Sequence, residues 1–508
     1  MKKNIYLGIL LLTWIGFFAT GCNETYNTPS LPSTLEIITE IPEGTPIMMA
    51  AGGSCEIQFK AENIQELTTN ENEGWKTETD LQKGVIKVTA PEANASGDYQ
   101  YKMVLTAQNG TESFHSQEIW FYCVKNFNDP KGTFVLNEGN MTTENGSLTY
   151  ITPEGYIIDD AYKLVNGTEL GNVTQDMCIH EGKIYIISQN GDRNPIGSEF
   201  QNDGMLVIAD ASTLKKVDAY KKEDLKGLTW PSHITVLDEE HVYIRDNGVA
   251  EGDNGSGKIW RLNTRDRSLK EIQNTTGVPK SPMYARNGKI YTYNHENKYG
   301  FLNYFYIVEI SAQTDEATIY STSTGDYVPV NILPTQKENT FWTLIKKDNK
   351  DEIAYKVTQA SLREVNKTVS ILYPSYILED APNSGSSGVM LVSPSDDTFY
   401  YTSSTYLIKG TYTEKSTGDA SGKQIEVTTE ALADLSELNP NARIVYNGMG
   451  IHPENGHLYI NTIKGMGGSY TTNTIWEFDL TQNFTAPVNQ WSNYTNFPAG
   501  FFFPSLTD

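Results

Sequence analysis

The side chains best suited to metal binding or acid–base chemistry in this sequence are its seven histidines. His452 and His457 would offer two imidazole ligands to a metal ion, but no Cys and no clearly placed carboxylate completes a site around them. His180 and His452 share one position in a sequence repeat, and His241 and His457 stand where other copies of the repeat carry lysine. We therefore interpret these histidines as turn residues and predict neither a metal centre nor a cofactor.

Oxygen-bearing side chains form the second group of candidates. Residues 190–194 and 247–257 are rich in Asp, Asn and Gly, which are suited to calcium, but they lack the ligand spacing of a dedicated loop and are interpreted as solvated turns. Glu138 is the carboxylate best suited to acid–base work, and we interpret it mainly as a turn residue. The chain has no GxSxG, HExxH or P-loop motif and no visible pair of nucleophile and base. The sequence therefore predicts a binding protein with no catalytic residue.

A repeat gives the architecture that must position any site. A turn followed by a short strand with a central aromatic residue recurs 48 to 59 residues apart, and each copy is followed by a second strand. The copies lie at residues 132–136, 182–186, 240–244, 288–292, 339–343, 397–401 and 456–460. Seven units of four short strands predict a seven-bladed β-propeller, in which each blade buries its faces against its neighbours.

The two ends of the repeat region predict how the ring closes. The first copy lacks the inner strand that precedes the others, and residues 500–506 have the pattern of that missing strand. Pairing of the C-terminus with the first blade would remove an exposed sheet edge. One departure from the repeat is residues 430–435, which predict a short helical insert before the seventh blade.

Residues 34–127 predict a separate unit, because short alternating strands there are divided by turn residues. The full fold class is thus all-β: a seven-bladed propeller over 128–508, preceded by a small immunoglobulin-like β-sandwich that acts as a spacer. Cys55 and Cys123 both fall in predicted strands of this spacer and are candidates for a disulfide. Cys178 has no obvious partner and is predicted to be a buried thiol.

The N-terminus predicts the compartment. Lys2 and Lys3 precede an apolar run over residues 5–19, too short for a membrane helix, and the run ends at Ala19 and a nearby Cys22. Small residues directly before a Cys resemble the lipobox of bacterial lipoproteins. This implies a signal peptide over 1–21, an acylated Cys22 and a tether over 22–33 that holds the protein at a membrane. The formal charge of −24 argues against a nucleic-acid partner.

The start of the propeller region resembles a known family. Residues 134–139 with 145–148, and 174–177 with 180–185 and 207–215, resemble the first two blades of YncE-like propeller lipoproteins of gut Gram-negative anaerobes. That group includes BtuG-like surface proteins, which capture cobalamin for a TonB-dependent outer-membrane transporter. The resemblance implies a surface-exposed outer-membrane lipoprotein that binds a nutrient and passes it to such a transporter. A corrinoid is the ligand that it suggests.

Propeller geometry predicts where a ligand would bind. Loops that lead into inner strands and loops that join second to third strands emerge on one face, where aromatic and polar residues suit a large amphipathic ligand such as a corrinoid or glycan. The alternatives are that Trp230 and Tyr327 merely plug the channel, that the face binds a protein, or that the propeller is a hydrolase or lyase. The candidate ligand-binding residues are Arg193, Trp230, Ser232, His233, Lys280, His295, Tyr299 and Tyr327.

Overall fold

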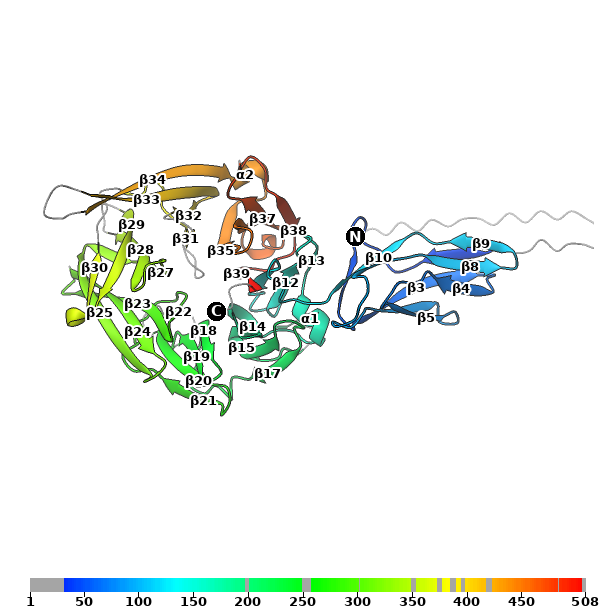
Figure 1. The fold of residues 1–508 in the computed structure, drawn as a ribbon, viewed down its shortest axis with the longest axis horizontal. Helices are drawn as coiled ribbons and strands as arrows, with labels where there is room; N and C mark the ends of the chain where they lie inside the picture. Colours follow the sequence, from blue (N-terminus) through cyan, green and yellow to red (C-terminus); the bar gives the residue numbers. More distant parts are fainter. Residues whose placement is uncertain are drawn as a thin grey trace, which may run out of the picture.

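The computed structural model describes residues 32–196, 201–248, 257–300, 302–348, 353–371, 377–383, 390–393, 398–416, 423–482 and 484–504. Cys22 and the predicted signal peptide lie outside these residues, so their assignment stays a prediction. A ring of small sheets makes up most of the molecule, and an elongated unit of strands extends from one side of it (Figure 1). Within the described part of the chain, no helix is long and apolar enough to cross a membrane.

The elongated unit contains three small antiparallel or mixed sheets around one core. The first contains β1 (Thr34–Ile37), β3 (Ser54–Glu62), β6 (Val85–Thr89) and β5 (Lys76–Asp80). The second contains β2 (Ile47–Ala50), β10 (Ile119–Val124) and β7 (Gln100–Met103). The third contains β4 (Glu66–Thr69), β8 (Leu105–Asn109) and β9 (Glu112–His115). Alternate residues of these strands point inward, and Trp75, Tyr101 and Phe121 pack at the centre of the core.

Four-stranded antiparallel sheets follow one another around the ring. The first three contain β39 (Pro498–Phe502), β11 (Thr133–Asn137), β12 (Ser147–Ile151) and β13 (Ile157–Ile158); β14 (Asn172–His180), β15 (Lys183–Gly191), β16 (Leu206–Asp210) and β17 (Lys216–Tyr220); and β18 (Pro231–Asp238), β19 (His241–Asp246), β20 (Lys258–Asn263) and β21 (Ser268–Glu271). The last two contain β31 (Leu391–Val392), β32 (Thr398–Ser403), β33 (Tyr406–Ser416) and β34 (Lys423–Asp434); and β35 (Ile444–Ile451), β36 (His457–Ile463), β37 (Asn473–Asp479) and β38 (Asn489–Ser492). Short helices α1 (Ala161–Asn166) and α2 (Leu435–Leu438) lie between them.

Between these sheets lies a single sheet of nine strands, which consists of two antiparallel groups. The first contains β22 (Tyr284–Arg286), β23 (Lys289–Lys298), β24 (Leu302–Ser311) and β25 (Glu316–Gly325). The second contains β26 (Tyr327–Pro329) and β27 (Leu333–Pro334), then β28 (Thr340–Asp348), β29 (Ile353–Arg363) and β30 (Thr368–Ile371), with the short turn η1 (Val365–Lys367). The two groups are joined only by a parallel bridge between Ser321 and Thr368. The all-β propeller class predicted from the repeat is confirmed.

The predicted strands of the repeat agree with the structure. Each predicted copy falls on the second strand of its group, which is β11, β15, β19, β23, β28, β32 or β36. Ring closure is also confirmed, because β39 pairs antiparallel with β11, with Phe502 opposite Phe134 and Gly500 opposite Leu136. The C-terminal strand therefore supplies the inner strand of a sheet whose other strands come from the start of the repeat region.

The predicted helical insert at residues 430–435 is misplaced. Residues up to Asp434 continue β34, where Ala431 pairs with Ile408 and Ala433 with Leu407. Helix α2 begins only at Leu435, after Asp434 caps it by accepting from the backbone N–H of Ser436. The Ala and Leu side chains favoured helix by propensity, but pairing with β33 and burial in the adjoining core hold this segment as a strand.

The predicted disulfide is not formed in the structure. Cys55 lies on β3 and Cys123 on β10, in different sheets, and both are free thiols. The thiol of Cys55 contacts the sulfur of Met49 at 3.9 Å, and that of Cys123 contacts the carbonyl of Pro91 at 3.8 Å. Burial raises the pKa of each thiol to about 11. Cys178, predicted to be a buried thiol, forms no disulfide and is only partly buried.

The elongated unit and the ring share a hydrophobic cluster. Tyr122, Val124 and Phe127 from the end of the first unit pack with propeller residues from the first sheets. The hydroxyl of Tyr122 donates to the Glu154 carboxylate at 2.6 Å, and its ring lies 5.2 Å from that of Tyr156. Because the contact includes buried aromatic residues as well as a polar bond, it fixes the direction in which the first unit leaves the ring (Figure 1).

Candidate functional site

The inner strands enclose a central channel that contains a cavity of about 390 Å³. We call the end of the channel where inner strands begin and second strands end the mouth. Most of the cavity wall is apolar, and its polar side chains lie on β14 and β18. The lining includes Gln175, Asp176, His233, Tyr284, Leu333, Met390, Leu391, Met449, Ile451, Phe501 and Phe503. An apolar cavity with a few convergent polar groups is a typical small-molecule site.

Irregular backbone is concentrated where the inner strands approach the mouth. The pairing register shifts in β14 between Asn172 and Asp176, in β18 after Pro231, and in β35 between Val445 and Met449. Val173 has a φ of 59°, which is strained for a β-branched residue. Bulges redirect side chains from their regular alternation, and they recur beside active and binding sites. Here they bring polar residues from three strands to the mouth.

Glu138 lies at the mouth, immediately after β11. Its carboxylate accepts a hydrogen bond from the Asn447 amide at 3.0 Å. Burial raises the pKa of Glu138 to about 7, while the positive charge of Lys280 and the side chains of Asn447, Gln175 and Tyr446 act in the opposite direction. The interpretation of Glu138 mainly as a turn residue was therefore incomplete, because residues from three other blades surround its carboxyl group.

Two basic side chains lie near the mouth, and one of them, Lys280, interacts both with Glu138 and with the other, Arg245. Burial lowers the pKa of Lys280 below its usual value, and the positive charge of Arg245 acts in the same direction. The negative charge of Glu138 opposes this shift. Arg245 is almost fully buried and donates to the Ser232 hydroxyl at 3.2 Å and the Val278 carbonyl at 2.9 Å, and also to Asn247. Burial lowers the pKa of Arg245 to about 10, and the negative charge of Asp246 opposes this shift.

Asp176 is the acidic residue that lines the cavity itself. Its two carboxylate oxygens accept one backbone N–H each, from Met177 and from Ile234, both at 2.9 Å. Burial raises the pKa of Asp176 to about 7, and these two hydrogen bonds lower it only in part. Beside it, the buried His233 ring contacts the Ser232 hydroxyl through Nδ1 at 3.1 Å. A carboxylate, an imidazole and an amide thus form the polar side of an otherwise apolar cavity.

Of the eight residues predicted to bind a ligand, the structure places three beside the cavity or beside the buried carboxyl group of Glu138. Ser232 and His233 are buried beside the cavity, and Lys280 acts on Glu138. Trp230 lies just before β18, is partly buried, and its backbone N–H donates to Asp246 at 2.7 Å. Tyr327 begins β26, where the Lys356 ammonium lies 5.1 Å from the centre of its ring.

The other three predicted residues are exposed and do not line the cavity. Arg193 follows β15, and its carbonyl accepts from Asn202. His295 and Tyr299 belong to the hairpin of β23 and β24, and Tyr299 is 82% exposed. Sequence reasoning missed Gln175, Asp176, Arg245, Tyr446 and Asn447. The sequence carried a sign of only two of them, Gln175 and Asp176, because they are polar residues at positions where an inner strand is expected to be apolar.

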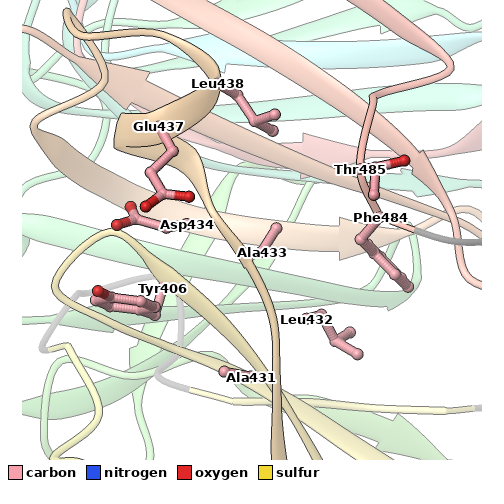
Figure 2. A pocket seen from close by; sticks show the side chains of 9 residues that line it. All are labelled: Tyr406, Ala431, Leu432, Ala433, Asp434, Glu437, Leu438, Phe484 and Thr485. Atoms are coloured by element: carbon pink, nitrogen blue, oxygen red, sulfur yellow. The ribbon is translucent and has the colours of Figure 1, made fainter.

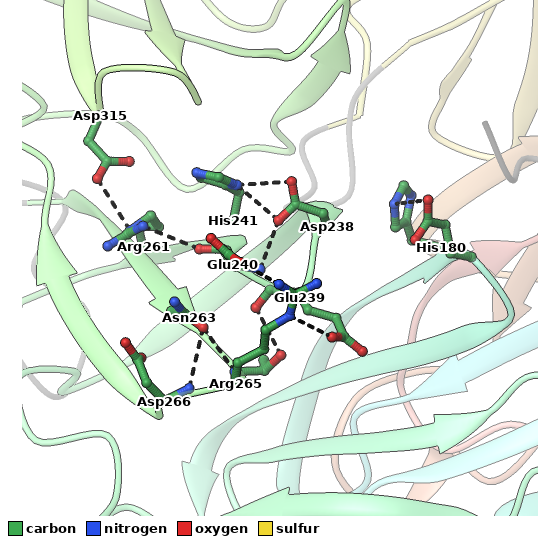
Figure 3. A network of polar contacts seen from close by, with 12 residues as sticks. His180, Asp238, Glu239, Glu240, His241, Arg261, Asn263, Arg265, Asp266 and Asp315 are labelled. Atoms are coloured by element: carbon green, nitrogen blue, oxygen red, sulfur yellow. Dashed lines mark hydrogen bonds and ion pairs between the residues drawn. The ribbon is translucent and has the colours of Figure 1, made fainter.

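Three further histidines, His241, His452 and His457, have structural partners. His457 Nδ1 lies 2.7 Å from the Glu477 carboxylate, as the Lys289 ammonium lies 2.9 Å from Glu309 in another sheet. His452 Nε2 contacts the Gly132 carbonyl at 3.2 Å. Figure 3 shows His241 beside Asp238, in a network of acidic and basic side chains at the turns opposite the mouth. Within the described ranges, no three His, Cys, Asp or Glu side chains are grouped to hold a metal ion.

A second cavity, of about 400 Å³, lies between α2 and the loop before β38 (Figure 2). Its wall combines the carboxylates of Asp434 and Glu437 with Tyr406 and Phe484. Asp434 already accepts from the Ser436 and Thr405 hydroxyls, both at 2.8 Å, in its role as the cap of α2. This cavity is therefore a surface recess beside a capped helix, and the channel remains the better candidate site.

Solved structures with a similar chain path are distant in sequence. A putative 6-phosphogluconolactonase from Bacteroides fragilis has 10% identity over 73% of this chain and 97% of its own, with a TM-score of 0.42. A lignostilbene dioxygenase from Pseudomonas brassicacearum has 9% identity over 73% of this chain and 92% of its own, with a TM-score of 0.40. Among curated proteins, none matches this sequence.

One family model matches most of the chain. It is described as a domain of unknown function, DUF5074, and it matches residues 131–504, which include every strand of the ring. The elongated first unit lies outside the matched region. The chain therefore belongs to the DUF5074 family.

Proposed function

We propose that this protein is a lipid-anchored binding protein of the outer-membrane surface, which captures a nutrient at the mouth of the channel and passes it to a TonB-dependent transporter. The observation that carries the binding role is the cavity, in which Gln175, Asp176 and His233 converge on an apolar wall. The anchor and the transporter rest on the resemblance of the N-terminus and first blades to YncE-like and BtuG-like lipoproteins. A corrinoid is the first ligand to test, and a glycan is the second.

The size of the cavity restricts how a corrinoid would bind. Cavities that enclose a drug-sized molecule measure roughly 300 to 1,000 Å³, and this one, at about 390 Å³, is near the lower limit. A corrinoid is larger than a drug-sized molecule, so it would lie across the mouth and extend only one group into the channel. Trp230 and Ser232, at the start of β18, and Lys280, shortly before β22, are the predicted residues that we assign to such a ligand.

Calorimetric titration with cyanocobalamin tests the binding role. We expect saturable binding, and we expect Trp230→Ala to weaken it by more than about 1 kcal/mol through loss of an aromatic contact. Tyr99→Ala, at an exposed position of the first unit, is the matched control and should bind as the wild type does. The melting temperature of each variant must stay close to that of the wild type. Absence of heat with both cyanocobalamin and cobinamide would reject the corrinoid and direct the titration to a glycan panel.

Membrane fractionation tests the anchor. Cys22→Ala should release the protein from washed membranes, because the acyl chains on Cys22 would be its hydrophobic anchor. Cys178→Ala removes a different thiol, inside the propeller, and should leave the protein in the membrane fraction. Retention of the Cys22→Ala protein in washed membranes would contradict the proposed lipidation.

A second candidate function is an enzyme, a hydrolase or lyase, and Glu138 is the observation that favours it. A carboxyl group with a pKa near 7, held beside Lys280 at the mouth of the channel, has the properties of a general acid or base. If any compound of the glycan panel is cleaved, Glu138→Gln should abolish the turnover and leave binding in place. Turnover that survives this substitution would remove Glu138 from the reaction.

A further inference from the structure

Among the buried charged groups that the structure describes around the channel, one acid has no basic group acting on it. These groups include the acids Glu138, Asp176 and Asp246 and the bases Lys280 and Arg245. The charge of Lys280 acts on Glu138, and the charge of Asp246 acts on Arg245. Asp176 is the acid left over, since its stabilising partners are two backbone N–H groups and no basic side chain of the described residues acts on it.

Asp176 also has the position of a ligand-binding group. It is the carboxylate that lines the cavity, and it remains partly accessible there although the surrounding protein desolvates it. Each of its oxygens accepts one backbone hydrogen bond, so each retains a lone pair for another donor. A bulge in β14 directs it away from the regular alternation of the strand. Burying an uncompensated carboxylate costs stability, which a bound cation would offset.

The rest of the wall suits the body of an apolar cation. Tyr284, Phe501 and Phe503 are aromatic, and Leu333, Met390 and Met449 are among the apolar residues beside them. Aromatic faces attract cations, and methionine side chains adapt to ligands of different shape. We propose that the channel binds an apolar or aromatic amine, with the ammonium group at Asp176 and the apolar body along the wall. This inference rests on the proposed binding role of the channel and specifies the class of ligand.

Titration with three compounds that share one body and differ in head group tests this inference. Phenethylamine, phenethyl alcohol and hydrocinnamate present a cation, a neutral hydroxyl and an anion on the same ring. We expect the amine to bind the full-length protein at least about tenfold more tightly than the alcohol at pH 8, and the acid to bind most weakly. Equal affinity for amine and alcohol would overturn the assignment of a cation site while leaving a binding channel in place.

The affinity for the amine should depend on pH. The ionisable groups that line the cavity with Asp176 are His233 on β18 and Tyr284 on β22, and the charge of Asp176 acts on Tyr284. Because the pKa of Asp176 is about 7, its charged fraction rises between pH 6 and 8, and we expect the dissociation constant of the amine to fall about tenfold over this range. The alcohol, whose binding needs no carboxylate charge, should show no such change. A pH-independent affinity for the amine would contradict the inference.

Substitution completes the test. Asp176→Asn should remove both the preference for the amine and its pH dependence, while binding of the alcohol persists as evidence that the channel is intact. Asp326→Asn, at an exposed position, is the matched control and should leave all three affinities unchanged. Failure of all three compounds to bind the wild type would overturn the amine site. The titrations with corrinoids and glycans would then decide the proposed function separately.

Discussion

A chain that ends before Pro498 is expected to lose its cooperative thermal unfolding. The truncation removes β39, the strand that pairs with β11 and supplies the inner strand of the first sheet. Phe501 and Phe503 are buried against the side chains of β35 and β36, and the Phe503 ring lies 4.7 Å from His452. Without them the inner face of β11 and the adjoining edge of β35 would be open to water.

The expected loss is comparable to the stability of a whole domain. Each buried Phe contributes about 1.5 to 3 kcal/mol, and each ladder hydrogen bond about 1 kcal/mol. Removal of three Phe residues and a strand therefore costs on the order of 10 kcal/mol, and domains are stable by about 5 to 15 kcal/mol. The exposed edge of β11 also becomes a template for pairing between molecules. We expect an insoluble protein, or one that unfolds over a broad range at much lower temperature.

Circular dichroism during heating measures this outcome. A matched control that lacks only residues 505–508 keeps all of β39 and should melt as the full-length chain does. Phe503→Ala provides an intermediate case, because it leaves the ladder of β39 and β11 in place and removes one buried ring. If the chain truncated before Pro498 melts cooperatively close to the full-length value, the pairing of β39 with β11 does not hold the ring together.

The strands and the ring closure were predictable because the information for them is local and repeated. A turn, an apolar strand and a central aromatic residue recur in every unit, so each copy supports the assignment of the others. The segment at residues 430–435 lacks this support. Its Ala and Leu residues are compatible with either helix or strand, and only pairing with β33 decides between them. The predicted disulfide between Cys55 and Cys123 was wrong for a similar reason. That both residues lie in strands does not determine the distance between their thiols.

The candidate site was predictable only in part. Ser232, His233 and Lys280 could be found because they precede or begin inner strands, which all start at the mouth. Gln175 and Asp176 reach the cavity through a bulge in β14, and a shift of register leaves no regular spacing in the sequence. Tyr446 and Asn447 also reach the mouth through a shift of register, in β35, although they lie about 300 residues beyond Glu138 in the sequence.

Removal of the Glu138 charge should stabilise the protein at alkaline pH. In the unfolded chain the carboxyl group has an ordinary pKa of 4.5, and burial raises it to about 7 in the folded protein. Below pH 4.5 both states are protonated and Glu138 has no effect on the pH dependence. Between pH 4.5 and 7 the unfolded state ionises first, so the folded state loses stability as the pH rises, by up to about 3 kcal/mol above pH 7. Glu138→Gln removes this loss.

The test is the difference in melting temperature between Glu138→Gln and the wild type, measured from pH 4 to pH 9. Asp176 and Asp160 also have pKa values raised to about 7 by burial, but they are present in both proteins and cancel in the difference. We expect the two proteins to melt together near pH 4 and the variant to melt several degrees higher at pH 8. A difference that stays constant across the range would show that the pKa of Glu138 is the same in the folded and unfolded states. The carboxyl group would then be ionised well below neutral pH, and it would no longer support acid–base chemistry at the mouth.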